Sequence, residues 1–166
     1  MERKTWNVLF LSTGNSARSI LAEAILNHFG KGRFRGYSAG SRPKGGVHPL
    51  AIDLLKTLGM PSGGFRSKHR DEFTGPRAPK MDFVFTLYDN AAGEVCPAGP
   101  GNPVTTQWGI PDPAAVEGDE MVRKNAFRIA YRQLENRIRL FANIKIRELD
   151  RLSLRQKVNE IRKTPG

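Results

Sequence analysis

Sulfur and metal-binding side chains are scarce in this chain of 166 residues. Its one cysteine, Cys96, excludes an internal disulfide and any zinc site built from several cysteines. The histidines, His28, His48 and His69, lack the spacing of a ligand set, so we predict no metal site. So little cysteine is typical of a protein from a reducing compartment.

Long apolar runs are also missing. No stretch approaches the roughly 20 apolar residues that a membrane-spanning helix needs. Residues 1–6 lead directly into a short apolar run and leave no room for the apolar core of a signal peptide. We therefore expect a cytoplasmic protein without a membrane partner.

Acidic residues are outnumbered by 27 Lys and Arg to 16 Asp and Glu, which gives a net charge of +11. Residues 121–163 hold 13 of the basic and only four of the acidic side chains. Such a surplus suits acidic partners or anionic surfaces, although a solvated helical face explains it more simply. No zinc-finger, RNA-recognition or helix-turn-helix pattern accompanies the charge, so we do not expect nucleic-acid binding.

Strand-like and helix-like segments alternate along the chain. Short apolar runs predict strands at residues 7–11, 34–38, 82–87 and 104–108. Apolar residues at helical spacing predict helices at 19–29, 48–58, 120–142 and 149–161, and stretches rich in Gly and Pro predict loops at 60–80 and 89–103. The alternation predicts an α/β fold, a four-stranded parallel sheet with helices on both faces. We expect one domain over residues 1–145 and a basic C-terminal helical extension over 146–166.

The segment Ser-Thr-Gly-Asn-Ser-Ala-Arg-Ser, residues 12–19, lies between an apolar strand and a helical pattern that begins at Ile20. Backbone N–H groups of such a loop and of the helix's first turn converge on one point, where the helix dipole favours an anion. Arg18 stands where that dipole disfavours a cation, unless it contacts an anion as well. The segment therefore predicts an oxyanion site that comprises Thr13, Gly14, Asn15, Ser16, Ala17, Arg18 and Ser19, with Ser16 also available as an ordinary helix cap.

This loop resembles the Cys-x5-Arg phosphate loop of the low-molecular-weight protein tyrosine phosphatases, and in detail that of the arsenate reductases that share their fold. Four further segments carry the resemblance in the same order. They are Ser38–Ser41 with Val47–Leu50, Arg66–Lys68 with Asp71–Phe73, Thr86–Pro97, and Trp108-Gly109-Ile110-Pro111-Asp112-Pro113. Together they cover about residues 6 to 150 and leave little room for chance agreement.

The resemblance assigns roles to single residues. It makes Arg18 the oxyanion-binding arginine and Asp112 the general acid, with Asn15 and Ser19 supporting the loop. It also places the family's nucleophilic cysteine at Ser12, the first of three catalytic positions with Arg18 and Asp112.

The redox relay of the reductases is similarly incomplete. The resemblance places its intermediate cysteine at Tyr88, and only Cys96, the last position of the relay, carries sulfur. Reduction of arsenate takes two electrons, which the family obtains by joining thiols into a disulfide. Ser12 and Tyr88 cannot take part, so we expect no arsenate reduction by this route and negligible ester hydrolysis. With a cysteine at position 12, the resemblance implies thioredoxin, or glutaredoxin with glutathione, as reductant, and no bound cofactor.

Three interpretations stay open. The chain is an arsenate reductase with an engineered, inactivating serine at position 12, although Tyr88 is a second loss that such a design would not need. Alternatively, it is a natural non-catalytic protein that binds arsenate, phosphate or a phosphorylated group as a sensor or partner, an interpretation that we favour slightly. A weak low-molecular-weight phosphatase is the third. The sequence does not fix the oligomeric state.

Overall fold

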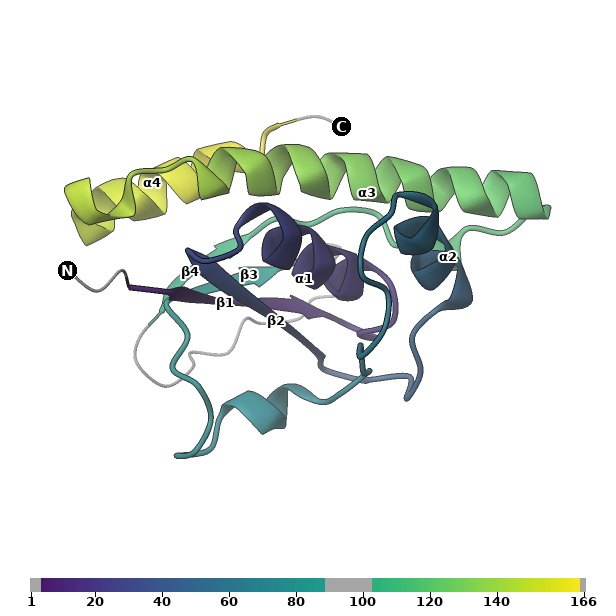
Figure 1. The fold of residues 1–166 in the computed structure, drawn as a ribbon, viewed down its shortest axis with the longest axis horizontal. Coiled ribbons are helices and arrows are strands. Elements are labelled where there is room, and N and C mark those ends of the chain that lie inside the picture. Colours follow the sequence, from purple (N-terminus) through teal and green to yellow (C-terminus); the bar gives the residue numbers. More distant parts are fainter. Residues whose placement is uncertain (1–3, 89–102, 165–166) are drawn as a thin grey trace.

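The computed structural model describes residues 4–88 and 103–164. Its centre is a four-stranded sheet of β1 (Trp6–Ser12), β2 (Phe34–Gly40), β3 (Phe83–Thr86) and β4 (Val104–Gln107). The strands are all parallel and lie in the order β2-β1-β3-β4 (Figure 1). The predicted four-stranded parallel sheet is thus confirmed. β1 reads as a continuous apolar run because it pairs on both edges and is covered on both faces.

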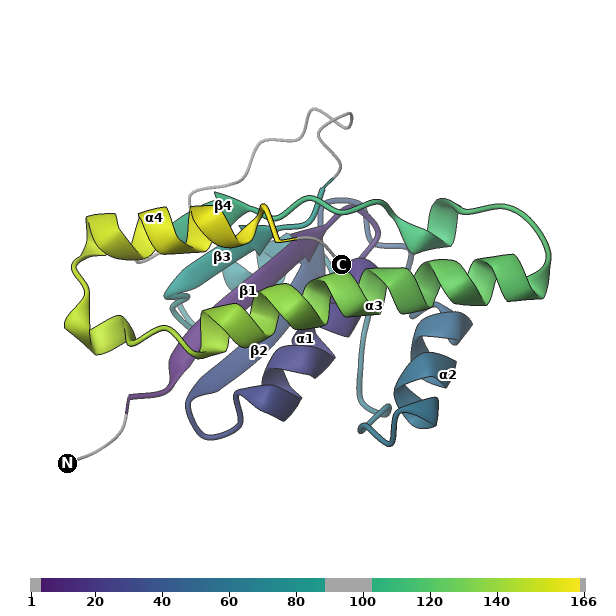
Figure 2. The same cartoon turned by 90° about the horizontal axis from the view of Figure 1, so that it is seen from above.

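The α-helices lie over one face of this sheet (Figures 1 and 2). They are α1 (Arg18–Phe29), α2 (Pro49–Thr57), α3 (Glu120–Ala142) and α4 (Arg151–Ile161). A short 3-10 helix, η3 (Pro113–Ala115), precedes α3, and another, η4 (Ile146–Glu148), lies between α3 and α4. α1 packs on β1 and β2, α3 packs on α1, and α4 lies beside β4. None of the helices in the described part of the chain is long and apolar enough to cross a membrane.

The opposite face of the sheet is covered differently. The predicted loop at 60–80 contains a one-turn 3-10 helix, η1 (Arg70–Phe73), whose Phe73 belongs to the same apolar cluster as Leu9, Leu11 and Val84. The helical cover on this face is therefore one 3-10 turn within the described residues. A stretch rich in Gly and Pro gave no periodic signal from which this turn could be predicted.

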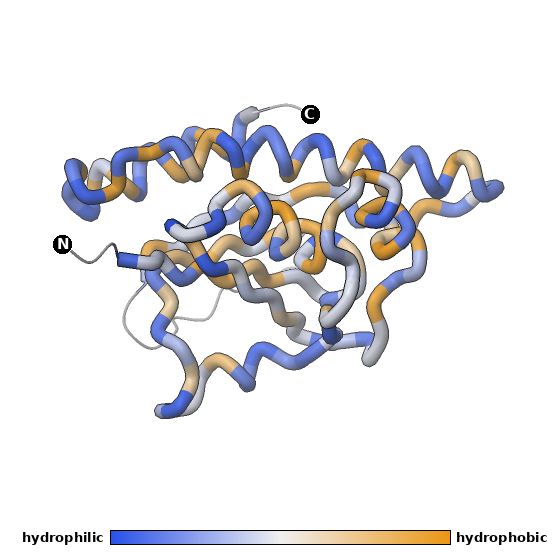
Figure 3. Tube along the Cα trace, in the orientation of Figure 1, coloured by the Kyte–Doolittle hydropathy of each residue, from blue (hydrophilic) through white to orange (hydrophobic). Residues whose placement is uncertain are grey.

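The main core lies between the sheet and the helices, where Figure 3 shows the apolar residues gathered. Phe85 stacks on Trp108 with ring centres 3.9 Å apart, and Phe141 of α3 packs edge-on against both rings. Val158 of α4 is fully buried, and its carbonyl accepts a hydrogen bond of 2.8 Å from the indole of Trp108. The C-terminal helix thus contributes to the same core, while the division of the chain at residue 145 stays a prediction.

Candidate functional site

The loop between β1 and α1 lies at the carboxyl edge of the sheet, where parallel α/β sheets bind their ligands. Its backbone is oriented by the neighbouring segment 41–48. Four loop carbonyls accept N–H donors from that segment, in the pairs Ser12–Ser41 (3.2 Å), Thr13–Arg42 (2.9 Å), Gly14–Lys44 (3.0 Å) and Ser16–His48 (2.8 Å). Because the C=O and N–H groups of a peptide unit point in opposite directions, these bonds turn the loop's N–H groups toward its inner side.

Asn15 holds the loop in its curved shape. It is fully buried with a φ of 45°, a left-handed conformation that asparagine tolerates better than most residues. Its Nδ2 donates to Ser19 Oγ at 2.7 Å, and its Oδ1 accepts from the backbone N–H of Lys68 at 2.8 Å. The backbone N–H of Asn15 donates to Ser12 Oγ at 3.2 Å. Asn15 therefore connects α1 and the segment before η1 through its side-chain amide, and β1 through its backbone N–H.

The N-terminus of α1 carries no capping side chain from the described residues. Its N-cap position is Ala17, and no acidic residue lies in its first turn. Ser16 precedes the cap and does not fill that role, contrary to the capping interpretation of the sequence. The partial positive charge at this helix end is therefore not offset by a side-chain cap, as in an anion-binding helix N-terminus.

Arg18, the first residue of α1, is only 5% exposed. Its Nη1 donates to the carbonyls of Leu87 at 2.8 Å and Ile110 at 3.2 Å, which follow β3 and β4. Its Nη2 lies 3.8 Å from Asp112 Oδ2. The two carbonyls and the carboxylate fix the plane of the guanidinium, so the charge is held in one orientation beside the loop.

Ser12 is the residue whose chemistry decides what the loop can do. It is 2% exposed, and its Oγ lies 2.6 Å from Ser19 Oγ in addition to its bond from Asn15 N–H. In the described ranges, its hydrogen-bond partners are thus a hydroxyl and an amide, and neither can act as a general base near neutral pH.

The other three positions to which the resemblance assigns a role, Asp112, Tyr88 and Cys96, differ in their surroundings. Asp112 is about one-third exposed and caps η3 by accepting from Ala114 N–H at 3.0 Å, with its other oxygen toward Arg18. Tyr88 is 1% exposed and packs in the core on the η1 side of the sheet. Cys96 lies outside the described residues. The structure thus brings Ser12, Arg18, Asp112 and the loop together, and it buries the side chain of Tyr88.

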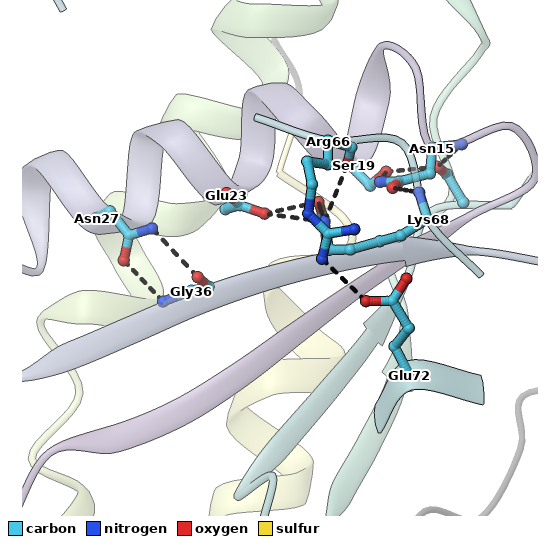
Figure 4. Close-up of polar contacts among 10 residues, drawn as sticks. Asn15, Ser19, Glu23, Asn27, Gly36, Arg66, Lys68 and Glu72 are labelled. Carbon is cyan, nitrogen blue, oxygen red and sulfur yellow. Dashed lines mark hydrogen bonds and ion pairs between the residues drawn. The ribbon is translucent and has the colours of Figure 1, made fainter. Parts of the chain in front are cut away.

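A partly buried charged cluster lies beside the loop, as Figure 4 shows. Glu23 Oε1 accepts from Ser38 Oγ at 2.7 Å and lies 3.9 Å from Lys68 Nζ. Burial raises the pKa of Glu23, although the Ser38 hydrogen bond and the charge of Lys68 lower it in part. Burial likewise lowers the pKa of Lys68, which Glu23 partly restores. Because Lys68 also contacts Asn15 through its backbone, the cluster fixes the segment that supports the loop.

Arg137 of α3 is a second buried cation that the sequence analysis missed. It is 7% exposed, and its Nη1 donates to the Trp108 carbonyl at 2.8 Å. Burial lowers its pKa. A signal was available, because Arg137 falls within the apolar stripe of α3, between Leu134 and Ile138.

No group of three or more His, Cys, Asp or Glu side chains that could hold a metal ion occurs in the part of the chain that the structure describes.

Comparisons with known proteins agree with this geometry. A sequence model of the family described as low molecular weight phosphotyrosine protein phosphatase matches residues 7–154. The arsenate reductase of Halalkalibacterium halodurans is 35% identical over 135 residues, which are 81% of this chain and 94% of that protein. The arsenate reductase of Bacillus subtilis is 32% identical over 142 residues, 86% of this chain and 97% of that protein.

Solved structures give the same result. An arsenate reductase from Archaeoglobus fulgidus superposes with a TM-score of 0.67 at 25% identity, covering 82% of this chain and 99% of its own. A thioredoxin-dependent arsenate reductase from Corynebacterium glutamicum has a TM-score of 0.57 at 25% identity, over 84% of this chain and 61% of its own. An arsenate reductase in the phosphate binding state has a TM-score of 0.60, also at 25% identity, over 81% of this chain and 97% of its own.

Proposed function

Given that the chain belongs to the low-molecular-weight phosphotyrosine protein phosphatase family, we propose that it binds a small tetrahedral oxyanion, phosphate or arsenate, in the loop of residues 12–19 and performs no thiol chemistry there. One observation carries the proposal. Segment 41–48 turns the loop's carbonyls outward, so its N–H groups line the inner side at the uncapped N-terminus of α1. Arg18 adds a buried, fixed positive charge to the same place.

The hydroxyl of Ser12 explains why binding is proposed without reduction. In this field a cysteine would have a lowered pKa and would react as a thiolate near neutral pH. A serine hydroxyl cannot join a disulfide, so it cannot deliver the electrons that arsenate reduction requires. Its contacts with Ser19 and Asn15 supply no base, so attack on a phosphate ester is unassisted as well.

The binding test is calorimetric titration with phosphate and with arsenate. Arg18→Ala is expected to weaken binding by at least about 2 kcal/mol, the scale of a lost charge-assisted contact in a partly dry site. That corresponds to roughly a thirtyfold higher Kd. Lys124→Ala, which removes an equal charge paired with Glu120 on the surface of α3, serves as the control. Equal phosphate affinity in the Arg18→Ala and Lys124→Ala proteins would contradict the proposal.

A second candidate, an arsenate reductase that lacks the first two of its three relay thiols, is favoured by the similarity to reductases, one of them thioredoxin-dependent. We expect arsenate reduction with thioredoxin or glutaredoxin to require Ser12→Cys, tested with and without Tyr88→Cys. Tyr88 is fully buried, so its replacement opens a cavity that costs about 3 kcal/mol. Folding of the double variant is therefore checked first by circular dichroism. A folded double variant without turnover would reject this candidate.

The third interpretation, a weak phosphatase, is tested with one further variant, Asp112→Asn. Hydrolysis of p-nitrophenyl phosphate by the unaltered chain that disappears in Asp112→Asn would support a catalytic role for this carboxylate. A sensor would bind phosphate with no turnover in either protein.

A further inference from the structure

A group of positive side chains borders the loop on the side of segment 41–48. Arg42 and Lys44 both donate backbone N–H groups to loop carbonyls, so this segment is attached along the loop. The methylenes of Lys44 lie over Gly14, where a Cβ would meet them at 3.2–3.4 Å. The exposed ammonium of Lys44 is therefore carried on a stem that rests directly on the anion loop.

α3 brings a second cation to the same border. The ring of Phe127 packs on the ring of His48 with centres 4.8 Å apart, and His48 N–H donates to the Ser16 carbonyl. Arg123 lies one helical turn before Phe127, on the same side of α3. Arg123 is thus on the side of α3 whose Phe127 contacts His48, and its positive charge acts on that imidazole.

The state of His48 agrees with this placement. Burial lowers the pKa of the imidazole, the positive charges of Arg123 and Lys44 lower it further, and Asp112 raises it. Both cations thus act on one ring that is bonded to the loop, although they come from segments about 80 residues apart in the sequence. Lys44 and Arg123 are thus two cations near the loop besides Arg18, and Asp112 is the acidic group that acts on the same ring.

We propose that Lys44 and Arg123 form a second anion-binding position beside the loop, so that the preferred ligand is a diphosphate group. One phosphate binds the N–H groups of the loop and Arg18, and the adjoining phosphate lies between the two cations. This inference rests on the proposed function, because it requires the first phosphate to bind in the loop.

The experiment compares inorganic phosphate with inorganic pyrophosphate by calorimetric titration without divalent cations. Lys44→Met and Arg123→Met are tested against Lys124→Met as the control. Methionine keeps the apolar stem that packs on Gly14, and all three variants lose one charge, so long-range attraction is matched. Lys124 is paired with Glu120 at 3.1 Å, and the loss of such a surface pair costs little stability.

We expect Lys44→Met and Arg123→Met each to weaken pyrophosphate binding about fivefold, as for the loss of one exposed charge-assisted contact, with phosphate affinity changed less than about twofold. Lys124→Met is expected to leave the ratio of the two affinities unchanged. If phosphate binds and all three variants have the same ratio, the second position is rejected and the proposed function stands. If the unaltered protein binds neither anion, the proposed function itself fails.

Discussion

Gly40, at the end of β2, lies against the anion loop so closely that no side chain fits there. A Cβ at this position would lie 2.6 Å from the Thr13 carbonyl oxygen, 3.0 Å from Asn15 Cβ and 3.1 Å from Asn15 N. Gly40→Ala therefore forces the loop to move by several tenths of an ångström. The displaced carbonyl is the one that accepts from Arg42 N–H, so the move disturbs the contact that orients the loop.

We expect Gly40→Ala to lower the free energy of unfolding by about 1–3 kcal/mol, the usual cost of overpacking a tight site. Phosphate affinity is expected to fall about tenfold, equivalent to 1.4 kcal/mol, because the N–H groups no longer converge on one point. Urea unfolding measures the first quantity and calorimetric titration the second.

Gly46→Ala is the matched control, because a Cβ there meets nothing within 4 Å. It removes the same flexibility from the unfolded chain, and its effect is expected to be neutral or stabilising by less than about 1 kcal/mol. If Gly40→Ala proves as stable as Gly46→Ala and binds phosphate equally well, the close contact between β2 and the loop does not shape the anion site.

Three further predictions concern the buried charges. In a double-mutant cycle, Lys68→Met is expected to destabilise the protein more when Glu23 is present than in a Glu23→Gln background. The expected coupling is about 1 kcal/mol or more, because the variant leaves the partly buried carboxylate without its positive partner. Urea unfolding that shows no coupling would contradict this pairing. The pKa of Glu23 is raised in the folded state, so the folded protein holds this proton more tightly than the unfolded chain and loses stability as pH rises from 4.5 through the folded pKa. Over that pH range the stability of Glu23→Gln relative to the unaltered protein should increase, which thermal melts at a series of pH values measure. Arg137→Met is expected to lower the free energy of unfolding in urea by about 2–3 kcal/mol, because the buried Trp108 carbonyl loses the hydrogen bond from Arg137. Arg139→Met, on the exposed side of α3, should lower it by less than about 1 kcal/mol.

Much of the fold was predictable from local signals in the sequence. The strands are short apolar runs, and α1 and α2 have their ends marked by Gly30 and Pro49. The anion loop was predictable for the same reason, since a strand, a small-residue turn and a helix follow one another directly in residues 6–29.

The contacts that support the loop were not predictable in this way. Lys68 reaches Glu23 across 45 residues of sequence, and Arg18 reaches the Ile110 carbonyl across 92. No periodicity or motif reports such pairs, because they depend on how the strands are ordered in the sheet. The 3-10 turn η1 was missed because one turn is too short to repeat a pattern.

The two carbonyls that hold Arg18 have a consequence for how the molecule fluctuates. An anion bound to the Arg18 guanidinium is connected through its hydrogen bonds to the Leu87 and Ile110 carbonyls, which follow β3 and β4, as well as to the loop between β1 and α1. Any opening that pulls the Leu87 or Ile110 carbonyl away must also release part of the anion's binding energy. By thermodynamic reciprocity, saturating phosphate should slow amide hydrogen exchange in β4, an edge strand that contributes no residue to the loop.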